Sequence, residues 1–179
     1  MLEQRIQQQF FDSADLLYRC AETMARPVAE AAAALLAAIT SGGKVLVCGS
    51  GAGAALAPHF ARLFTGRFER ERPPLAAVAL GVRAAQEVRA LGLPGDVLLY
   101  IDDADDGHTT VISAAQAKDM TIVVLAGRSA QAFGELLAET DVLVAVPHER
   151  GARVTELQLL VIHCLCDAVD YQLMGEQEK

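Results

Sequence analysis

The sequence predicts an α/β fold, a three-layer α/β/α sandwich in which helices cover both faces of a five-stranded parallel sheet. Five short apolar runs alternate with segments of helical character, and such alternation requires crossover connections, which make neighbouring strands parallel. The length of 179 residues suits one domain with a sizeable core. We therefore expect a single domain over residues 1–179, with N-terminal helices in 1–40 and the sheet core and C-terminal helix in 44–174.

The N-terminal region is expected to form two helices. Residues 1–20 carry apolar side chains such as Ile6 and Phe10 at helical spacing. The alanine-rich stretch 27–40 has high helix propensity, and the glycines that follow it at 42–43 end the second helix. We expect these helices to serve oligomerisation.

The sheet is expected to be built from short apolar runs that are bounded by turn residues. The expected strands are residues 44–47, 75–80, 97–101, 121–125 and 141–146. The expected helices after them are residues 54–65, 83–91, 108–118, 129–139 and a long closing helix at 153–174 with a broad apolar face.

Composition and charge exclude several classes of protein. The net charge of −8 argues against direct binding to nucleic acid, which depends on Lys and Arg. No uncharged apolar run approaches the roughly 18 to 20 residues of a membrane helix, so no membrane partner is expected. The N-terminus is charged where a secretory signal would be apolar, and the four cysteines are interpreted as reduced thiols. We expect a cytoplasmic protein with a protein partner.

The stretch VCGSGAGAALAPHF at 47–60 has the pattern of a strand that runs through a glycine-rich turn into a helix. Glycines let backbone N–H groups approach a ligand, and the start of the next helix favours an anion. Tight packing of the turn explains the glycines equally well. The candidate ligand-binding residues here are Ser50, Gly51, Ala52, Gly53 and His59.

Several stretches together resemble the SIS (sugar isomerase) family, in the branch that holds the phosphoheptose isomerases and the DnaA initiator-associating protein. They are GKVLVCGSG at 43–51, HFA at 59–61, RFERERPPLAAVAL at 67–80, LGLPGDVLL at 91–99, DMTIVVLAGR at 119–128 and ARVTELQLLVIHCLCDAVDYQL at 152–173. The initiator-associating protein is the more similar of the two. The resemblance implies a five-stranded parallel sheet and self-association as a homodimer or homotetramer.

The chain departs from the pattern of the isomerases at two of four functional positions. His59 and His163 match the histidines of the family, but the glutamate position is Leu63 and the glutamine position is Thr155. Zinc is the metal that the resemblance implies, and two histidines make an incomplete site for it, so we expect no cofactor. Isomerisation also needs a general base, which Leu63 cannot provide. His163 is the candidate catalytic residue if the chain is active.

The phosphate-binding loop of the family also differs here. Its Ser/Thr-rich segment is replaced by an acidic loop at 102–106, where carboxylates would repel a phosphate, and Gly53 replaces a serine of the glycine turn. We interpret the acidic loop as a solvated turn and assign it no other role.

These departures favour a non-catalytic scaffold that controls replication initiation by binding DnaA, with Leu173 and Met174 at the C-terminal end as candidate partner-binding residues. Two alternatives remain open. One is a phosphoheptose isomerase that converts sedoheptulose 7-phosphate to heptose 7-phosphate. The other is a regulator that binds a small molecule in the former sugar-phosphate pocket.

Overall fold

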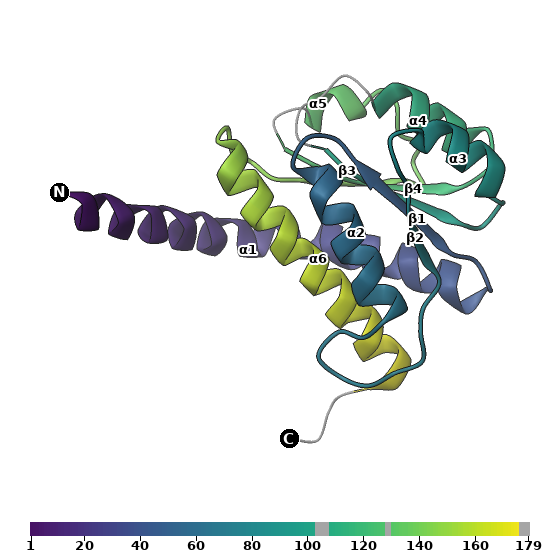
Figure 1. The fold of residues 1–179 in the computed structure, drawn as a ribbon, viewed down its shortest axis with the longest axis horizontal. Coiled ribbons are helices and arrows are strands. Elements are labelled where there is room, and N and C mark those ends of the chain that lie inside the picture. The colour runs from purple at the N-terminus through teal and green to yellow at the C-terminus, as the bar shows by residue number, and fades with distance from the viewer. Residues whose placement is uncertain (103–107, 128–129, 176–179) are drawn as a thin grey trace.

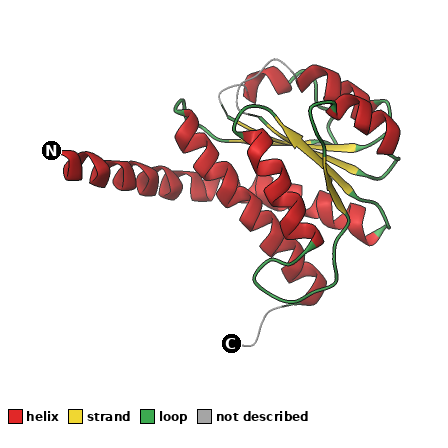
Figure 2. Cartoon of the chain, viewed as in Figure 1, coloured by secondary structure: helices red, strands yellow, loops and turns green. Residues whose placement is uncertain are grey.

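The structure, a computed structural model, describes residues 1–102, 108–127 and 130–175, with the side chain of His108 left out. Five parallel strands form one sheet in the order β2-β1-β3-β4-β5. The strands are β1 (Val45–Gly49), β2 (Ala77–Ala79), β3 (Val97–Ile101), β4 (Thr121–Ala126) and β5 (Val142–Ala145). The predicted fold class is therefore confirmed, and each expected strand has its counterpart in the sheet (Figures 1 and 2).

Helices cover both faces of the sheet. They are α1 (Leu2–Thr40), α2 (Gly53–Thr65), α3 (Ala84–Leu91), α4 (His108–Gln116), α5 (Ala130–Phe133) and α6 (Gly151–Met174). Side chains alternate along each strand, so that Val45 and Val47 face the core with α1, α2 and α6, whereas Leu46 and Cys48 face the core with α3, α4 and α5. The three central strands β1, β3 and β4 are buried on both faces, as expected of parallel strands.

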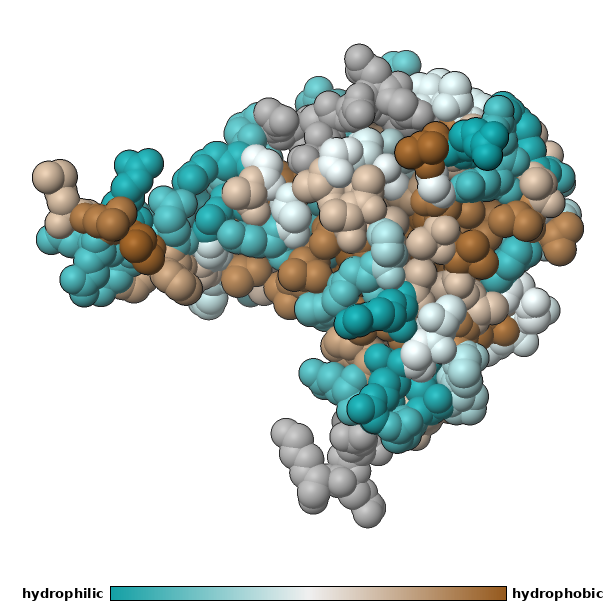
Figure 3. Space-filling model, in the orientation of Figure 1, coloured by the Kyte–Doolittle hydropathy of each residue, from teal (hydrophilic) through white to brown (hydrophobic). Residues whose placement is uncertain are grey.

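The two helices expected in the N-terminal region are one helix. α1 continues through Pro27, which removes one backbone hydrogen bond, because alanines flank the proline and the middle of α1 packs against α6. The buried residues of α1 begin at Leu16. The preceding turns project from the body (Figure 1) and expose Ile6, Phe10 and Phe11, and hydrophobic side chains are visible on this projecting end (Figure 3).

Within the residues that the structure describes, two helices, α1 and α6, are long and apolar enough to cross a membrane by length and composition alone. They pack against one another, and both contribute buried side chains to the same core on one face of the sheet. This packing is that of core helices in a folded α/β domain.

Candidate functional site

The glycine turn connects β1 to α2 at the carboxyl end of the sheet, where ligands bind in open α/β folds. A Cβ at Gly49 or Gly53 would overlap the backbone of β3 at Ile101, so both positions require glycine. Gly51 has φ +50°, a conformation that favours glycine. Packing and backbone conformation therefore account for these three glycines without a ligand.

A buried hydrogen-bond network lies beneath the turn. The hydroxyl of Ser50 donates to the Oδ1 atom of Asp102 over 3.1 Å, and the Asp102 side chain is fully buried at the end of β3. Gln158 of α6 donates from Nε2 to the carbonyl oxygens of Asp102 and Leu125, at 2.7 and 3.1 Å. The ends of β3 and β4 are thereby tied to α6, and Ser50 is fixed in orientation.

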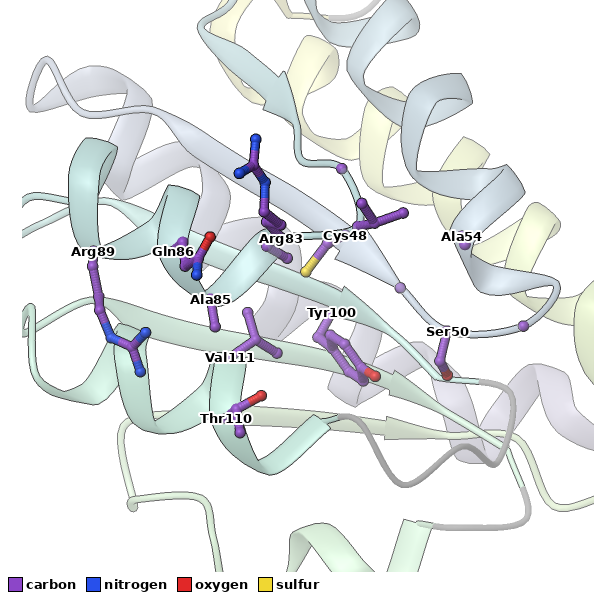
Figure 4. A pocket seen from close by; sticks show the side chains of 15 residues that line it. Cys48, Ser50, Ala54, Arg83, Ala85, Gln86, Arg89, Tyr100, Thr110 and Val111 are labelled. Atoms are coloured by element: carbon purple, nitrogen blue, oxygen red, sulfur yellow. The ribbon is translucent and has the colours of Figure 1, made fainter.

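A hollow of about 590 Å³ opens beside the turn, between it and the helices α3 and α4 (Figure 4). The described residues that line it are Cys48, Gly49, Ser50, Gly51, Ala54, Gly81, Val82, Arg83, Ala84, Ala85, Gln86, Arg89, Tyr100, Thr110 and Val111. Its volume is in the range of small-molecule sites. Of the predicted ligand-binding residues, Ser50 and Gly51 line this hollow, whereas Ala52, Gly53 and His59 are not among the residues that line it.

The two matched histidines meet on the other side of the turn. His59 projects from α2 and His163 from α6, and their Nε2 atoms are 3.3 Å apart, the distance of a hydrogen bond. Phe68 stacks on the His163 ring, with 5.6 Å between ring centroids. Burial, followed by the nearby positive charges of His163 and Arg62, lowers the pKa of His59 from its ordinary 6.5. A neutral imidazole at His59 can accept a proton at neutral pH.

The residues around the histidine pair do not complete a metal site. Leu63 is partly buried against the core and has no donor atom for a metal, and the hydroxyl of Thr155 donates to the carbonyl oxygen of Gly151 over 3.0 Å. Zinc takes three or four N, S or O ligands. Among residues 1–102, 108–127 and 130–175, no group of three His, Cys, Asp or Glu side chains is placed to hold an ion.

The remaining predicted residues lie elsewhere. Leu173 and Met174 end α6, each 38% exposed, on the surface. The acidic loop lies outside the described residues from Asp103 to Asp106, and only Asp102 is placed. Its carboxylate is buried under Ser50 and bonded to it, so it is not among the charges that line the hollow.

Sequence reasoning missed the two arginines of the hollow and the role of Gln158. Arg83 and Arg89 belong to α3, and no spacing motif links them to the glycine turn. The expected parallel sheet could have revealed them, because it places the segment after the second strand next to the turn after the first strand. Gln158 could have been noted as a polar residue on the apolar face of the closing helix.

The model of the SIS domain family matches residues 9–127. A phosphoheptose isomerase of Methylibium petroleiphilum is 52% identical over 99% of this chain and 98% of that protein, and one of an Azoarcus species is 42% identical over 97% and 98%. The solved structure of phosphoheptose isomerase GmhA from Neisseria gonorrhoeae superposes with a TM-score of 0.84 at 34% identity, covering 95% of this chain and 99% of that one. A phosphoheptose isomerase structure from Francisella tularensis gives a TM-score of 0.88 at 30% identity, covering 95% and 98%.

These relatives correct one expectation drawn from the sequence. The non-catalytic scaffold that binds DnaA is wrong as the leading interpretation, because the full-length relatives are phosphoheptose isomerases. Leu63 and Thr155, at two of the four functional positions, were interpreted as a loss of catalysis, and the relatives do not support that interpretation. The sequence alone did not show that the two retained histidines lie within hydrogen-bond distance of one another.

Proposed function

Because the chain belongs to the SIS domain family and, within it, to the family of the phosphoheptose isomerases, we propose that it interconverts a ketose and an aldose phosphate. The substrate we propose is sedoheptulose 7-phosphate, and the product a heptose 7-phosphate. The observation that carries the proposal within the site is the pair of imidazoles, His59 and His163, at 3.3 Å. They supply the proton-transfer groups that such a reaction needs.

The reaction moves one proton between neighbouring carbons. In the direction from ketose to aldose, neutral His59 takes a proton from C1 of the sugar while His163 gives a proton to the carbonyl oxygen at C2. The resulting enediol then receives the proton from His59 at C2, and the hydroxyl at C1 returns its proton to His163. Charge balances at each step, and both groups end as they began.

The contact between the rings sets the donor and the acceptor before the substrate binds, and the substrate must then replace this hydrogen bond with its C1 proton at His59 and its carbonyl oxygen at His163. Only one hydrogen can lie between the two Nε2 atoms, so one ring donates while the other accepts. The lowered pKa of His59 favours it as the acceptor, which is the state required of a base. Phe68, stacked on His163, restricts the orientation of that ring.

No step is derived through a metal, because the donor set around the histidines is incomplete, with Leu63 and Thr155 at the remaining family positions. We propose a reaction that uses the two imidazoles alone. Cytoplasmic location and self-association go with the proposal, and the exposed apolar side chains of α1 support self-association. A DnaA partner and partner roles for Leu173 and Met174 stay untested predictions.

The experiment is an isomerase assay in deuterated water. Purified protein is incubated with sedoheptulose 7-phosphate, and NMR follows both the aldose phosphate and the uptake of solvent deuterium at the carbon that exchanges its proton. We expect both signals, and we expect His163→Ala to remove them. His148→Ala is the matched control, because it removes an imidazole from the loop before α6. Absence of exchange and product, while an established phosphoheptose isomerase turns over in the same assay, would refute the proposal.

A further inference from the structure

We propose that Phe68, presented by a strained turn at Glu69, fixes the orientation of the His163 ring and is thereby a positioning residue for proton transfer. That the oriented ring transfers a proton rests on the proposed function. The orientation itself is inferred from the contacts of the histidine pair, from the backbone at Glu69 and from the hydrogen bonds of the loop after α2.

The histidine pair has few polar contacts that could fix its rings. The Nε2 atoms of His59 and His163 are 3.3 Å apart, and neither ring has another hydrogen-bond partner among residues 1–102, 108–127 and 130–175. The direction of a reacting imidazole is commonly set by a hydrogen bond at its second nitrogen. A substrate between the rings would also replace the one bond that they share. His163 therefore needs a restraint that does not use its nitrogens.

The aromatic ring of Phe68 supplies such a restraint. Phe68 lies in the loop after α2 and is partly buried against the core. Its ring stacks on that of His163, with 5.6 Å between the ring centroids and 28° between the ring planes. This separation is within the range at which aromatic rings attract one another. Because the contact is made through the face of the imidazole, it limits the tilt of the ring and leaves both nitrogens available to exchange a proton.

The backbone at Glu69 is strained. Its φ is +54°, in the left-handed region, where the Cβ of an L residue comes too close to the backbone. The N–H of Arg70 donates to the carbonyl oxygen of Phe68, so the chain turns over three residues with Glu69 at the centre. Strained residues persist only where their surroundings hold them, and they gather at functional sites. The side chain of Glu69 is exposed, so the strain serves the placement of its neighbour Phe68.

Hydrogen bonds to α2 and to the end of α6 hold the loop in place. Arg72, whose side chain is almost fully buried, donates to the carbonyl oxygens of Leu63 and Phe64 in the last turn of α2, each over 2.8 Å. Arg70 donates over 3.0 Å to the carbonyl oxygen of Gly175, which follows α6, and the loop passes beside this end of α6 (Figure 1). The loop is thereby fastened to both helices that carry the histidines.

The test uses paired variants of the two central residues. Phe68→Leu removes the ring and keeps an apolar side chain, whereas Phe68→Tyr keeps the ring. Glu69→Gly permits the positive φ, whereas Glu69→Pro forbids it, because proline fixes φ at about −65°. Tyr171→Leu is the matched control, because it removes an exposed aromatic ring from α6, the helix of His163.

The isomerase assay is expected to separate these variants by kcat. Phe68→Leu and Glu69→Pro should lower kcat about 10- to 100-fold and change the KM of sedoheptulose 7-phosphate less than about twofold, because a misplaced reacting group affects the chemical step. Phe68→Tyr, Glu69→Gly and Tyr171→Leu should each keep kcat within about twofold of the wild type. Denaturant unfolding of every variant checks that it is folded under the conditions of the assay.

A second readout does not depend on turnover. The rings of the four histidines are labelled with ¹³C, and the NMR signal of His163 is identified by its absence from the spectrum of His163→Ala. The ring current of a stacked phenyl group shifts the signals of the imidazole beneath it. We expect Phe68→Leu and Glu69→Pro to move the His163 signal in the same direction, and Phe68→Tyr, Glu69→Gly and Tyr171→Leu to leave it near its wild-type position.

Three results would overturn the inference: a wild-type kcat in Phe68→Leu, an equal loss of kcat in Phe68→Tyr, or a His163 signal that does not move in Phe68→Leu. Turnover that does not depend on Phe68 leaves the isomerase proposal standing and removes this one. If the wild type has no turnover while the His163 signal responds to Phe68→Leu and Glu69→Pro, the isomerase proposal fails and the orientation of His163 by Phe68 stands.

Discussion

The two sides of the glycine turn differ in burial and in charge. On the α2 and α6 side, His59 and His163 are half-buried and touch one another. On the α3 and α4 side, Arg83 and Arg89 are exposed around an open hollow. Burial can shift the pKa of an imidazole, so its charge depends on its surroundings. A guanidinium at the surface stays positive. Under the proposed function, proton transfer belongs to the side with the imidazoles, because only their charge can change near neutral pH.

The largest effect is expected from the histidines. His59→Ala or His163→Ala should lower kcat by about 10²- to 10⁴-fold, the usual contribution of general acid–base catalysis. The Kd of sedoheptulose 7-phosphate, measured by calorimetry, should change little, because neither imidazole is among the described residues that line the hollow beside the turn. A variant that keeps its kcat and loses affinity instead would contradict the proposed role of the histidines in proton transfer.

The next effect concerns a buried ion pair on the α2 and α6 side that is not part of the histidine pair. Arg72 donates from Nε to Asp170 over 2.6 Å, with both side chains almost fully buried, and also donates to the carbonyl oxygens of Leu63 and Phe64. Removing one partner leaves an uncompensated buried charge, so Asp170→Ala should cost about 3 to 5 kcal/mol of unfolding free energy. Denaturant unfolding measures this loss.

The control for that variant is Asp12→Ala, which removes an exposed partner of Arg150 at 3.7 Å. Exposed pairs contribute about 0 to 1 kcal/mol, so this variant should unfold almost as the wild type does. Below its unfolding transition, Asp170→Ala should retain kcat within a few fold. Equal stabilities of the two variants would show that the Arg72 pair does not hold α6 to the loop after α2.

The pH dependence gives a smaller and more specific effect. Because the pKa of His59 lies below 6.5, the neutral base persists at pH 6.5 and is lost only as the pH falls further, when His59 takes up a proton. We expect kcat/KM to fall with one proton on the acidic side, with the midpoint of this limb below pH 6.5. The acidic limb of the pH profile is measured by deuterium exchange into unphosphorylated sedoheptulose. This sugar has no phosphate group, so no ionisation of the substrate adds to the profile. A limb centred above pH 6.5 would contradict the assignment of His59 as the base.

Much of this organisation was available from the sequence. Parallel strands buried on both faces have unmistakable apolar runs, so the five strands and their order along the chain were predicted. The histidine pair was named, although its contact depends on how α2 and α6 cross, which no local pattern encodes. Two helices, in residues 1–20 and 27–40, were expected where α1 is continuous, and α1 runs through Pro27 without a break.

The other side of the turn was less accessible. Arg83 and Arg89 are surface residues of a short helix, and only the three-dimensional placement of α3 gives them a hollow to line. The acidic residue Asp102 was predicted to repel a phosphate, yet it is buried beneath Ser50. The direction of a side chain at the end of a strand is set by its hydrogen-bond partners, and Ser50 comes from a segment about fifty residues earlier in the sequence.

The smallest expected effect is that of metal removal. Dialysis against a chelator should leave kcat and KM unchanged within error, because Leu63 and Thr155 take the places of the remaining family ligands, and two imidazoles hold zinc weakly. The measurement is the isomerase assay before and after dialysis, with zinc then added back. Activity that is lost with the chelator and restored by zinc would show that the histidine side acts through an ion. Leu63→Glu provides a sharper comparison: if a third ligand is what the site lacks, this variant should bind zinc in a colorimetric titration where the wild type does not.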